Sequence, residues 1–180
     1  MKAIFISLAI ILLSLSAIAD EITVDINRIA LLTPPQRDGE SESNRIALHF
    51  DIPDSLSGKH IVYAEIIADL DFSNVDNNEN TSIELQAYNI GSNWDTDGAD
   101  WNNLADDIDT LNYYTYTFDI SNESKVFMDV TGFIKDIIQG KRDNFGLMLI
   151  PHKFDQWAYQ IDSSIVSQIG ANARLRIVYD

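Results

Sequence analysis

The sequence predicts an all-β fold: a jelly-roll-like antiparallel β-sandwich of about nine strands, with one short helix around residues 131–139. Three observations support this prediction. Apolar and polar residues alternate with a period of two over many short segments, turn-forming residues fill the gaps, and strand starts recur roughly every 10 to 20 residues. No repeat or linker divides the chain, so residues 20–180 are expected to form a single domain.

Each expected strand shows this alternation and is bounded by turn-forming residues. The expected strands lie within Glu21–Leu32, Arg45–Ile52, His60–Phe72, Ser82–Ile90, Tyr113–Ile120, Lys125–Val130, Phe145–Ile150, Trp157–Ile161 and Ala173–Tyr179. The alternation also assigns faces. It places Tyr114, Tyr116 and Phe118 together on a buried face. It also places Val62 on the buried face of its strand and His49 on an exposed face.

The stretch Lys125–Pro151 predicts a strand, a short helix, a turn and a second strand. Asp129 ends the first strand, where its carboxylate can accept hydrogen bonds from the following backbone amides. Thr131 is the expected N-cap of the helix, and Gly140 ends the helix where a left-handed residue is needed. After a short polar turn, a continuous apolar strand is expected to end at Pro151.

Residues 1–19 have the pattern of an export signal. Lys2 supplies a positive charge, Ala3–Leu15 forms a hydrophobic run, and residues 17–19 match the small-x-small cleavage pattern. The run is short for a membrane span, and an uncleaved N-terminal anchor is the alternative. The chain is therefore expected to be secreted, to the extracellular space or the cell surface, without membrane insertion after cleavage. It contains no cysteine, so its core alone, or a metal, must hold the fold together.

The chain is strongly acidic, with 28 Asp and Glu residues against 12 Lys and Arg residues and a formal net charge of −16. Cleavage of the signal removes one further positive charge, that of Lys2. Such a surface repels nucleic acid and anionic lipid, which excludes both as expected partners. It attracts cations, of which calcium is the usual one for acidic extracellular loops, and plain solubility is the alternative explanation of the charge.

Calcium is the only cofactor that the sequence suggests, and the candidate ligands lie in one loop. Asp95, Asp97, Asp100 and Asp106 could turn several oxygens onto one hard cation if the loop bends at Gly98. The EF-hand pattern fails, because the glycine falls at the wrong position and no helices flank the loop. A solvated acidic loop is the alternative.

Catalytic motifs are missing from the sequence. The three histidines are scattered, and neither an H-E-x-x-H pattern nor a G-x-S-x-G elbow occurs. A glycosidase needs only two carboxylates, but the sequence singles out no pair among so many acids. The protein is therefore not expected to be an enzyme.

Two aromatic residues and three basic residues are the candidates for ligand binding. Tyr113 faces outward if its neighbours face the core, and Trp157 follows a polar loop. Lys153, Arg174 and Arg176 are scarce positive charges that an acidic polysaccharide would need. The alternatives are half-buried aromatic residues of an ordinary sheet and salt bridges to neighbouring carboxylates.

Five pieces of the sequence occur in a familiar order. They are NRIALHFDIP, HIVYAEIIADL, NIGSNWDTDGADWNN, FMDVTGFIKDIIQGKRDNFGLMLIP and ARLRIVYD. In this order they resemble the DNRLRE-domain family, secreted β-sandwich modules of surface proteins and of chains that degrade polysaccharides. Asp100 stands where Thr is usual, Ile137 where Trp is usual and Ala173 where Pro is usual.

The resemblance implies a β-sandwich over roughly residues 22–179 and offers no catalytic residues to carry over. Some related members are described as carbohydrate-binding modules, and others look like structural parts of cell-surface proteins. The resemblance makes the paired tryptophans framework residues, although two tryptophans in a loop could also stack on sugars. The framework residues are then Trp94, Trp101, Asp129, Thr131, Gly140, Asn144 and Gly146.

Two functions follow from these observations. The first is a non-catalytic structural subunit of a cell-surface layer, filament or matrix, which binds copies of itself or other surface proteins through strand edges or acidic loops. The alternative is a carbohydrate-binding module for an extracellular polysaccharide, with or without structural calcium.

Overall fold

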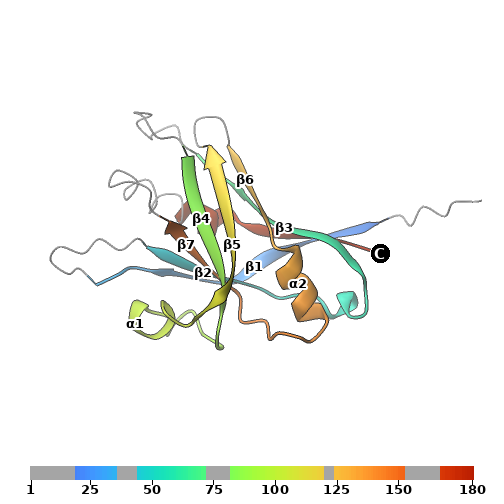
Figure 1. The fold of residues 1–180 in the computed structure, drawn as a ribbon, viewed down its shortest axis with the longest axis horizontal. Coiled ribbons are helices and arrows are strands. Elements are labelled where there is room, and N and C mark those ends of the chain that lie inside the picture. Colours follow the sequence, from blue (N-terminus) through green and yellow to red (C-terminus); the bar gives the residue numbers. More distant parts are fainter. Residues whose placement is uncertain (1–18, 36–43, 72–81, 120–123, 153–166) are drawn as a thin grey trace, which may run out of the picture.

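The computed structural model describes residues 19–35, 44–71, 82–119, 124–152 and 167–180. Within these ranges, eight antiparallel strands form one nearly closed, barrel-like sheet (Figure 1). The strands are β1 Asp20–Leu32, β2 Arg45–Phe50, β3 Ile61–Asp69, β4 Ser82–Ile90, β5 Ile108–Asp119, β6 Lys125–Asp129, β7 Leu147–His152 and β8 Arg174–Tyr179. Their order in the sheet is β5-β4-β7-β2-β1-β8-β3-β6. The expectation of a mostly-β fold with antiparallel strands is therefore confirmed.

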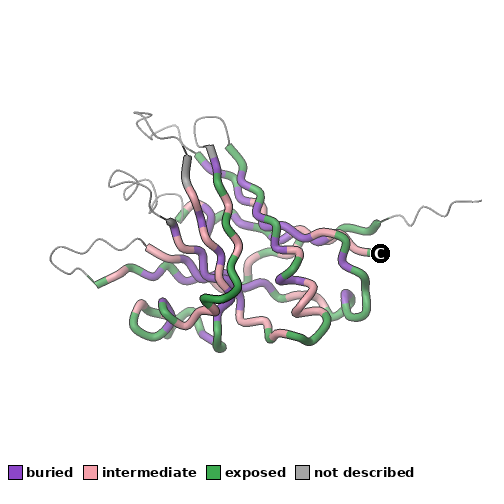
Figure 2. The backbone as a smooth tube through the Cα atoms, viewed as in Figure 1, coloured by how far each residue is buried: buried purple, intermediate pink, exposed green. Residues whose placement is uncertain are grey.

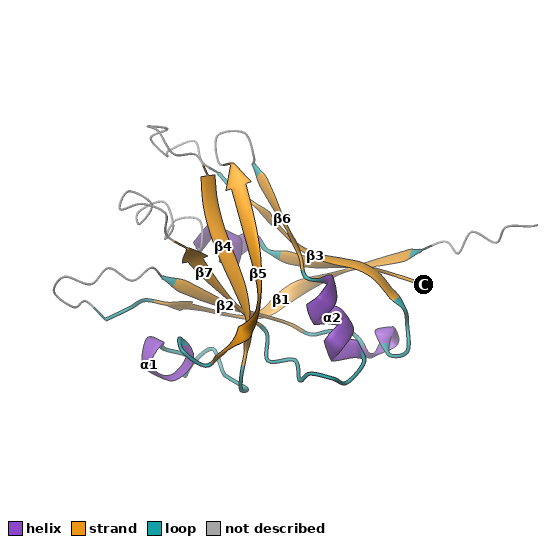
Figure 3. Ribbon diagram, viewed as in Figure 1, coloured by secondary structure: helices purple, strands orange, loops and turns teal. Residues whose placement is uncertain are grey.

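The strand β1 joins the two halves of the sheet. Its first part, Asp20–Asp25, pairs with β8, and its later part pairs with β2. The register with β2 shifts between Ile26 and Arg28, which marks a β-bulge at Asn27. A bulge bends a strand and increases its twist. The bend lets the two halves of the sheet face each other around a common core (Figure 3).

The inner faces of the strands supply the main core. Along β6, Val126 and Met128 are buried, whereas Lys125 and Phe127 are exposed. The predicted inward tyrosines of β5 pack against the same core, as does Phe118, so this assignment of faces is confirmed. Figure 2 shows buried and exposed positions alternating along the strands. The largest fully buried side chains are those of Leu32, Ile46, Leu48, Leu56, Ile66, Leu85, Met128, Ile134, Leu147, Met148 and Leu149.

A second apolar cluster covers the outer face of part of the sheet. Its buried members are Ala30, Leu32, Ala47, Ile90, Trp94, Leu104, Ala105 and Met148. Residues 91–107, which include the short helix α1 (Trp101–Leu104), supply Trp94, Leu104 and Ala105 to it. The small side chains of Ala30 and Ala47 on the strands allow this loop to pack closely. As a result, β2 is buried on both faces, and its burial is continuous rather than alternating.

The helix α2 (Thr131–Ile138) follows β6, as the sequence predicts. Its N-cap is Val130 and not Thr131, which is already the first helical residue. The Thr131 hydroxyl instead bonds the backbone of Ala64 on β3, 2.9 Å from its nitrogen and 3.2 Å from its oxygen. At the other end, Gly140 has a φ of 66°, which confirms the expected left-handed position. Residues 139–141 close the helix with backbone bonds to residues 135–137.

The strand β7 includes Pro151, which the sequence analysis wrongly placed at its end. Pro151 pairs with Leu85 on β4. The strand on the other side, β2, pairs with β7 only as far as Leu149. The missing N–H of Pro151 therefore removes no bond to β2, which is how a buried strand accommodates a proline.

Two further expectations were wrong in detail. β5 begins at Ile108, five residues before Tyr113, because its pairing with β4 continues to Ile90 past a register shift. Val62 is 46% exposed rather than buried. A register shift between Ile61 and Tyr63 turns Ile61 inward and Val62 outward.

Two further helical segments connect strands of the sheet. A 3-10 turn at Asp54–Leu56 buries Leu56, and a helical segment at 167–172 precedes β8. The expected strand Trp157–Ile161 lies outside the described residues. None of the helices in the described ranges is long and apolar enough to cross a membrane.

Candidate functional site

The two end strands of the sheet, β5 and β6, meet along a seam. They are neighbours in the sequence, yet β5 pairs with β4 and β6 pairs with β3, so they occupy opposite ends of the strand order. Within the described residues, no strand pairs with the second edge of either. The seam is therefore the place where the barrel-like sheet stays open (Figure 1).

At its end nearest α2, two tyrosines of β5 reach across the seam. The hydroxyl of Tyr116 donates to the backbone carbonyl oxygen of Asp129. The hydroxyl of Tyr114 lies so close to Gly132, in the first turn of α2, that a side chain there would press against it. Burial, followed by the nearby Asp129 carboxylate, raises the pKa of Tyr116 well above its usual value. Burial also raises the pKa of Tyr114. Both hydroxyls therefore stay protonated at neutral pH and can act as donors.

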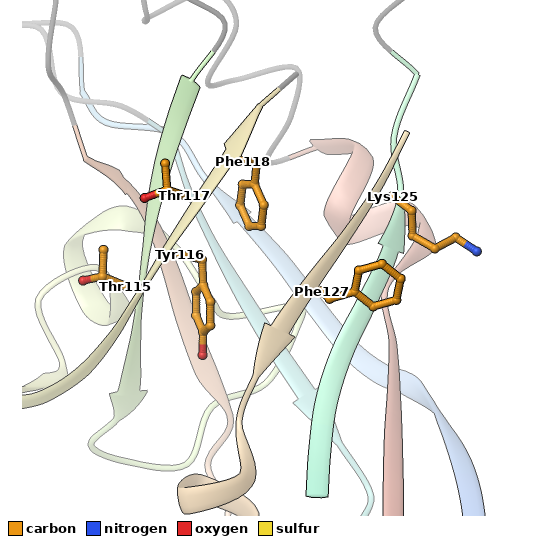
Figure 4. Close-up of a pocket in the computed structure, with 6 residues that line it drawn as sticks. All are labelled: Thr115, Tyr116, Thr117, Phe118, Lys125 and Phe127. Carbon is orange, nitrogen blue, oxygen red and sulfur yellow. The ribbon is translucent and has the colours of Figure 1, made fainter. Parts of the chain in front are cut away.

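Farther along the seam, the two strands enclose an open groove of about 480 Å³. The residues that line this β5–β6 groove are Thr115, Tyr116, Thr117, Phe118, Lys125 and Phe127 (Figure 4). The rings of Tyr116 and Phe118 lie on the side of β5 that faces the core, and the two threonines lie on its other side. Phe127 is 53% exposed. Aromatic, threonine and lysine residues thus line the groove, and the Lys125 side chain extends away from β5 (Figure 4).

Tyr113 lies on the outer face of β5, as expected, and is 50% exposed. Its ring stacks on Tyr88 of β4, with the ring centroids 5.2 Å apart. Thr115 and Thr117 follow along the same outer face of β5, and both are exposed. This face therefore continues from Tyr113 to the rim of the groove.

The other predicted ligand-binding residues are not assembled with Tyr113. Arg174 and Arg176 lie on β8, which is separated from β5 by four strands. Arg176 pairs with Glu21 at 3.0 Å and with the buried Glu65 at 2.8 Å, and these contacts raise its pKa. Arg174 lies 3.4 Å from Asp69. These guanidinium groups form cross-strand salt bridges, the alternative use that the sequence allowed. Lys153 and Trp157 lie outside the described residues.

Both tryptophans of the acidic loop pack against arginines of the sheet. The guanidinium of Arg28 lies 5.1 Å from the ring centroid of Trp94, and that of Arg45 lies 4.6 Å from the ring centroid of Trp101. Both arginines also donate to backbone carbonyls of the loop, Arg28 to Trp94 and Arg45 to Ala105. The Trp94 indole N–H donates to the Phe145 carbonyl at 2.7 Å. These contacts anchor residues 91–107 to the second apolar cluster.

The four carboxylates of the calcium prediction are dispersed along that loop. Asp100 caps α1, with its Oδ1 accepting from the backbone of Asn102 and Asn103, and Asp106 pairs with Arg45 at 3.2 Å. Asp95 and Asp97 are exposed. Among the described residues, no three acidic or histidine side chains form a group that could hold a metal ion. Calcium binding stays a prediction.

The framework residues around β6 and β7 hold backbone segments together. Asp129 Oδ1 accepts from the Thr131 N–H at 2.9 Å, as the sequence predicts. The Asn144 side chain donates to the Phe50 carbonyl at 2.8 Å. Gly146 has a φ of 95° and lies against the Leu48 carbonyl, where a side chain would not fit.

The expectation that His49 is exposed was wrong, since it is only 5% exposed. Its Nδ1 lies 2.6 Å from Oδ1 of Asn27, the bulged residue of β1, and its Nε2 lies 3.0 Å from the Asn144 carbonyl oxygen. Burial lowers the pKa of His49, and the nearby Arg28 lowers it further. The alternating pattern predicts that His49 faces solvent. The bulge instead brings the polar side chain of Asn27 against it.

The β5–β6 groove was not among the sites expected from the sequence. Two strands joined by a short loop usually pair as a hairpin, so nothing local in residues 108–129 shows that an open seam separates them. A signal was nevertheless present: Phe127 is a large apolar residue on the outward side of an alternating strand. A comparison with known protein families and with curated proteins found no match to the chain.

Proposed function

We propose that the protein is a non-catalytic structural subunit of an extracellular layer, filament or matrix, and that copies of it associate through the free edge of β5. One observation carries this proposal. β5 ends the described sheet, is 12 residues long, and has no charged residue between Asp109 and Asp119. The free edge of such a strand offers backbone N–H and C=O groups to another strand.

The other end strand is less suited to pairing. β6 has only five residues, and two of them, Lys125 and Asp129, are charged. Lys125 also forms a salt bridge with Asp69 at 3.1 Å. Short length and charged side chains are the features by which sheet edges resist association. The contrast between the two ends supports β5 as the pairing strand.

A second copy of the chain is the partner that fits this edge. Most of the surface of a chain with a net charge of −16 repels another copy. Antiparallel pairing of β5 with itself, about a two-fold axis, places uncharged residues opposite uncharged residues. Leu111, which is 88% exposed, and Tyr113 add apolar area on the same strand.

The proposal includes export by residues 1–19 and a jelly-roll-like sandwich of the DNRLRE type. The exchange of partners along β1, from β8 to β2, supports the sandwich, because a strand behaves this way where it passes between two packed sheets. The five ordered motifs support the family. The proposed partners are copies of the chain or other surface proteins. Nucleic acid is not a proposed partner.

Light scattering during size exclusion tests the association. The protein is produced in an exporting host, and intact mass shows whether residues 1–19 have been removed. We expect the apparent mass to rise with concentration, and electron microscopy to show polymers if a second contact extends the pair. Thr115→Glu brings two carboxylates together near the two-fold axis and should leave a monomer. A wild-type monomer at every concentration would overturn the proposal.

Thr23→Glu is the matched control. Thr23 is also exposed, but it lies on β1, an interior strand of the described sheet, where it pairs with Arg176 of β8. This variant carries the same charge change and should associate like the wild type. If both variants lose self-association equally, the added negative charge, and not the β5 edge, explains the loss. Unchanged association of Thr115→Glu would exclude β5 as the contact.

A further inference from the structure

The outer face of β4 and β5 carries side chains in three cross-strand pairs. Tyr88 lies opposite Tyr113, Gln86 opposite Thr115, and Glu84 opposite Thr117. This face is distinct from the edge used in the proposed association, since it presents side chains rather than backbone groups. It also differs from the neighbouring outer face over β2, which residues 91–107 cover.

An aromatic platform stands at one end of this face. Tyr88 and Tyr113 stack with their ring planes 28° apart, and Tyr113 remains half exposed. Because Tyr88 supports one side of the Tyr113 ring, the orientation of the ring is fixed before any ligand arrives. A rigid, exposed ring with a polar tip is suited to the C–H face of a sugar ring, which is apolar while its rim carries hydroxyls.

A row of polar groups continues from the platform along β4. The Tyr88 hydroxyl donates to Gln86 Oε1 at 2.6 Å, and Gln86 Nε2 lies 3.4 Å from Glu84 Oε1. Thr115 and Thr117 place exposed hydroxyls beside this row, and they also form the rim of the β5–β6 groove. Oriented amide, carboxylate and hydroxyl groups next to a ring are the groups that recognise sugar hydroxyls.

The charge of the face selects among polysaccharides. Its charged member is Glu84. Lys125 of the groove already pairs with Asp69, and Arg45, which lies near Tyr88, already pairs with Asp106. A polyanion would meet repulsion both from the Glu84 carboxylate and from the acidic chain as a whole. We infer that the outer face of β4 and β5 is a binding site for a neutral polysaccharide, with Tyr113 as the stacking residue and Gln86, Glu84, Thr115 and Thr117 as hydrogen-bonding residues.

Affinity electrophoresis of the exported protein tests this site. Native gels contain hydroxyethylcellulose, xyloglucan or galactomannan as neutral probes, alginate as the acidic probe, or no polysaccharide. We expect retardation in at least one neutral gel and none in alginate. Tyr113→Ala should weaken the retardation about tenfold, and Tyr113→Phe, which keeps the ring, should largely preserve it. The gel without polysaccharide reports association between copies, so failure of the proposed self-association is seen separately.

Phe127→Ala is the matched control, because Phe127 is exposed to a similar extent on the other end strand. This variant should bind like the wild type. Three results would overturn the inference: mobility unchanged in every neutral gel, retardation in alginate alone, or equal retardation of Tyr113→Ala and the wild type. Loss of binding in Phe127→Ala alone would also overturn it, by moving the site to β6.

Discussion

The hydroxyl of Tyr116 on β5 donates to the backbone carbonyl oxygen of Asp129 at the end of β6. This bond spans the seam between the two ends of the sheet, where the described residues of β5 and β6 form no ladder of backbone bonds. The carboxylate of Asp129 caps the Thr131 amide, and Thr131 bonds to Ala64 on β3. A single tyrosine hydroxyl therefore ties β5 to the junction of three other elements, and the groove lies farther along the same seam.

Removal of this hydroxyl should loosen the seam. We expect Tyr116→Phe to lower the free energy of unfolding by about 1 kcal/mol, because one hydrogen bond is lost and the Asp129 carbonyl loses its side-chain partner. Urea denaturation measures the effect. Tyr113→Phe is the control, since its hydroxyl belongs to a half-exposed ring, and it should change stability by only a few tenths of a kcal/mol. Equal effects of the two variants would contradict the importance of the Tyr116 bond.

The strands could be predicted from the sequence because alternation is a local property. Val126 and Met128 face inward, and Arg174 and Arg176 face outward, as a period of two requires. The errors arise where the backbone departs from that period. A register shift turns Val62 outward, and a neighbouring bulge supplies the buried His49 with a polar partner, Asn27.

The candidate site depends on strand order, which is not local. Thr115 and Phe127 are only twelve positions apart, yet they line the two sides of a groove because their strands end opposite edges of the sheet. The outward position of Tyr113 could be predicted, but its stacking partner could not. Tyr88 lies on the preceding strand, and the register between the two strands sets the pair.

Two framework glycines should differ in their tolerance of a side chain. Both have a positive φ, 66° at Gly140 and 95° at Gly146. An added Cβ at Gly140 meets nothing, whereas at Gly146 it would overlap the Leu48 carbonyl on β2. We expect Gly140→Ala to cost about 1 kcal/mol of unfolding free energy and Gly146→Ala about 3 kcal/mol or more. Urea denaturation measures both losses of stability. Equal losses would show that β2 moves away from the added methyl group at position 146 without a loss of stability.

The two loop tryptophans should also differ in their contribution to stability. Trp94 is 7% exposed and its indole N–H donates to Phe145, whereas Trp101 is partly exposed and packs on Arg45. We expect Trp94→Ala to cost about 3–5 kcal/mol, as for other buried aromatic residues. Trp101→Ala should cost about 1–2 kcal/mol because less apolar area is lost. Thermal and urea unfolding measure both, and a larger cost at Trp101 would contradict the anchoring described here.

Acid should destabilise the fold through His49. Burial and the nearby Arg28 lower its pKa in the folded state below the unfolded value of 6.5, although the Asn144 carbonyl and Asp51 act in the opposite direction. Below pH 6.5 the unfolded chain therefore binds a proton that the folded chain does not, and stability falls as pH decreases toward the folded pKa. This window lies above the range in which most carboxylates titrate. We expect the free energy of unfolding to decline between pH 7.5 and 5.5.

The slope of stability against pH identifies the residue responsible. One proton contributes at most about 1.4 kcal/mol per pH unit, so the change is measurable by urea denaturation at closely spaced pH values. His49→Gln should reduce the slope of unfolding free energy against pH, even if the substitution also changes the stability at neutral pH. His60→Gln is the control, because the His60 side chain is 72% exposed, and it should keep the wild-type slope. If His49→Gln keeps that slope too, the acid sensitivity comes from the carboxylates and not from the buried imidazole.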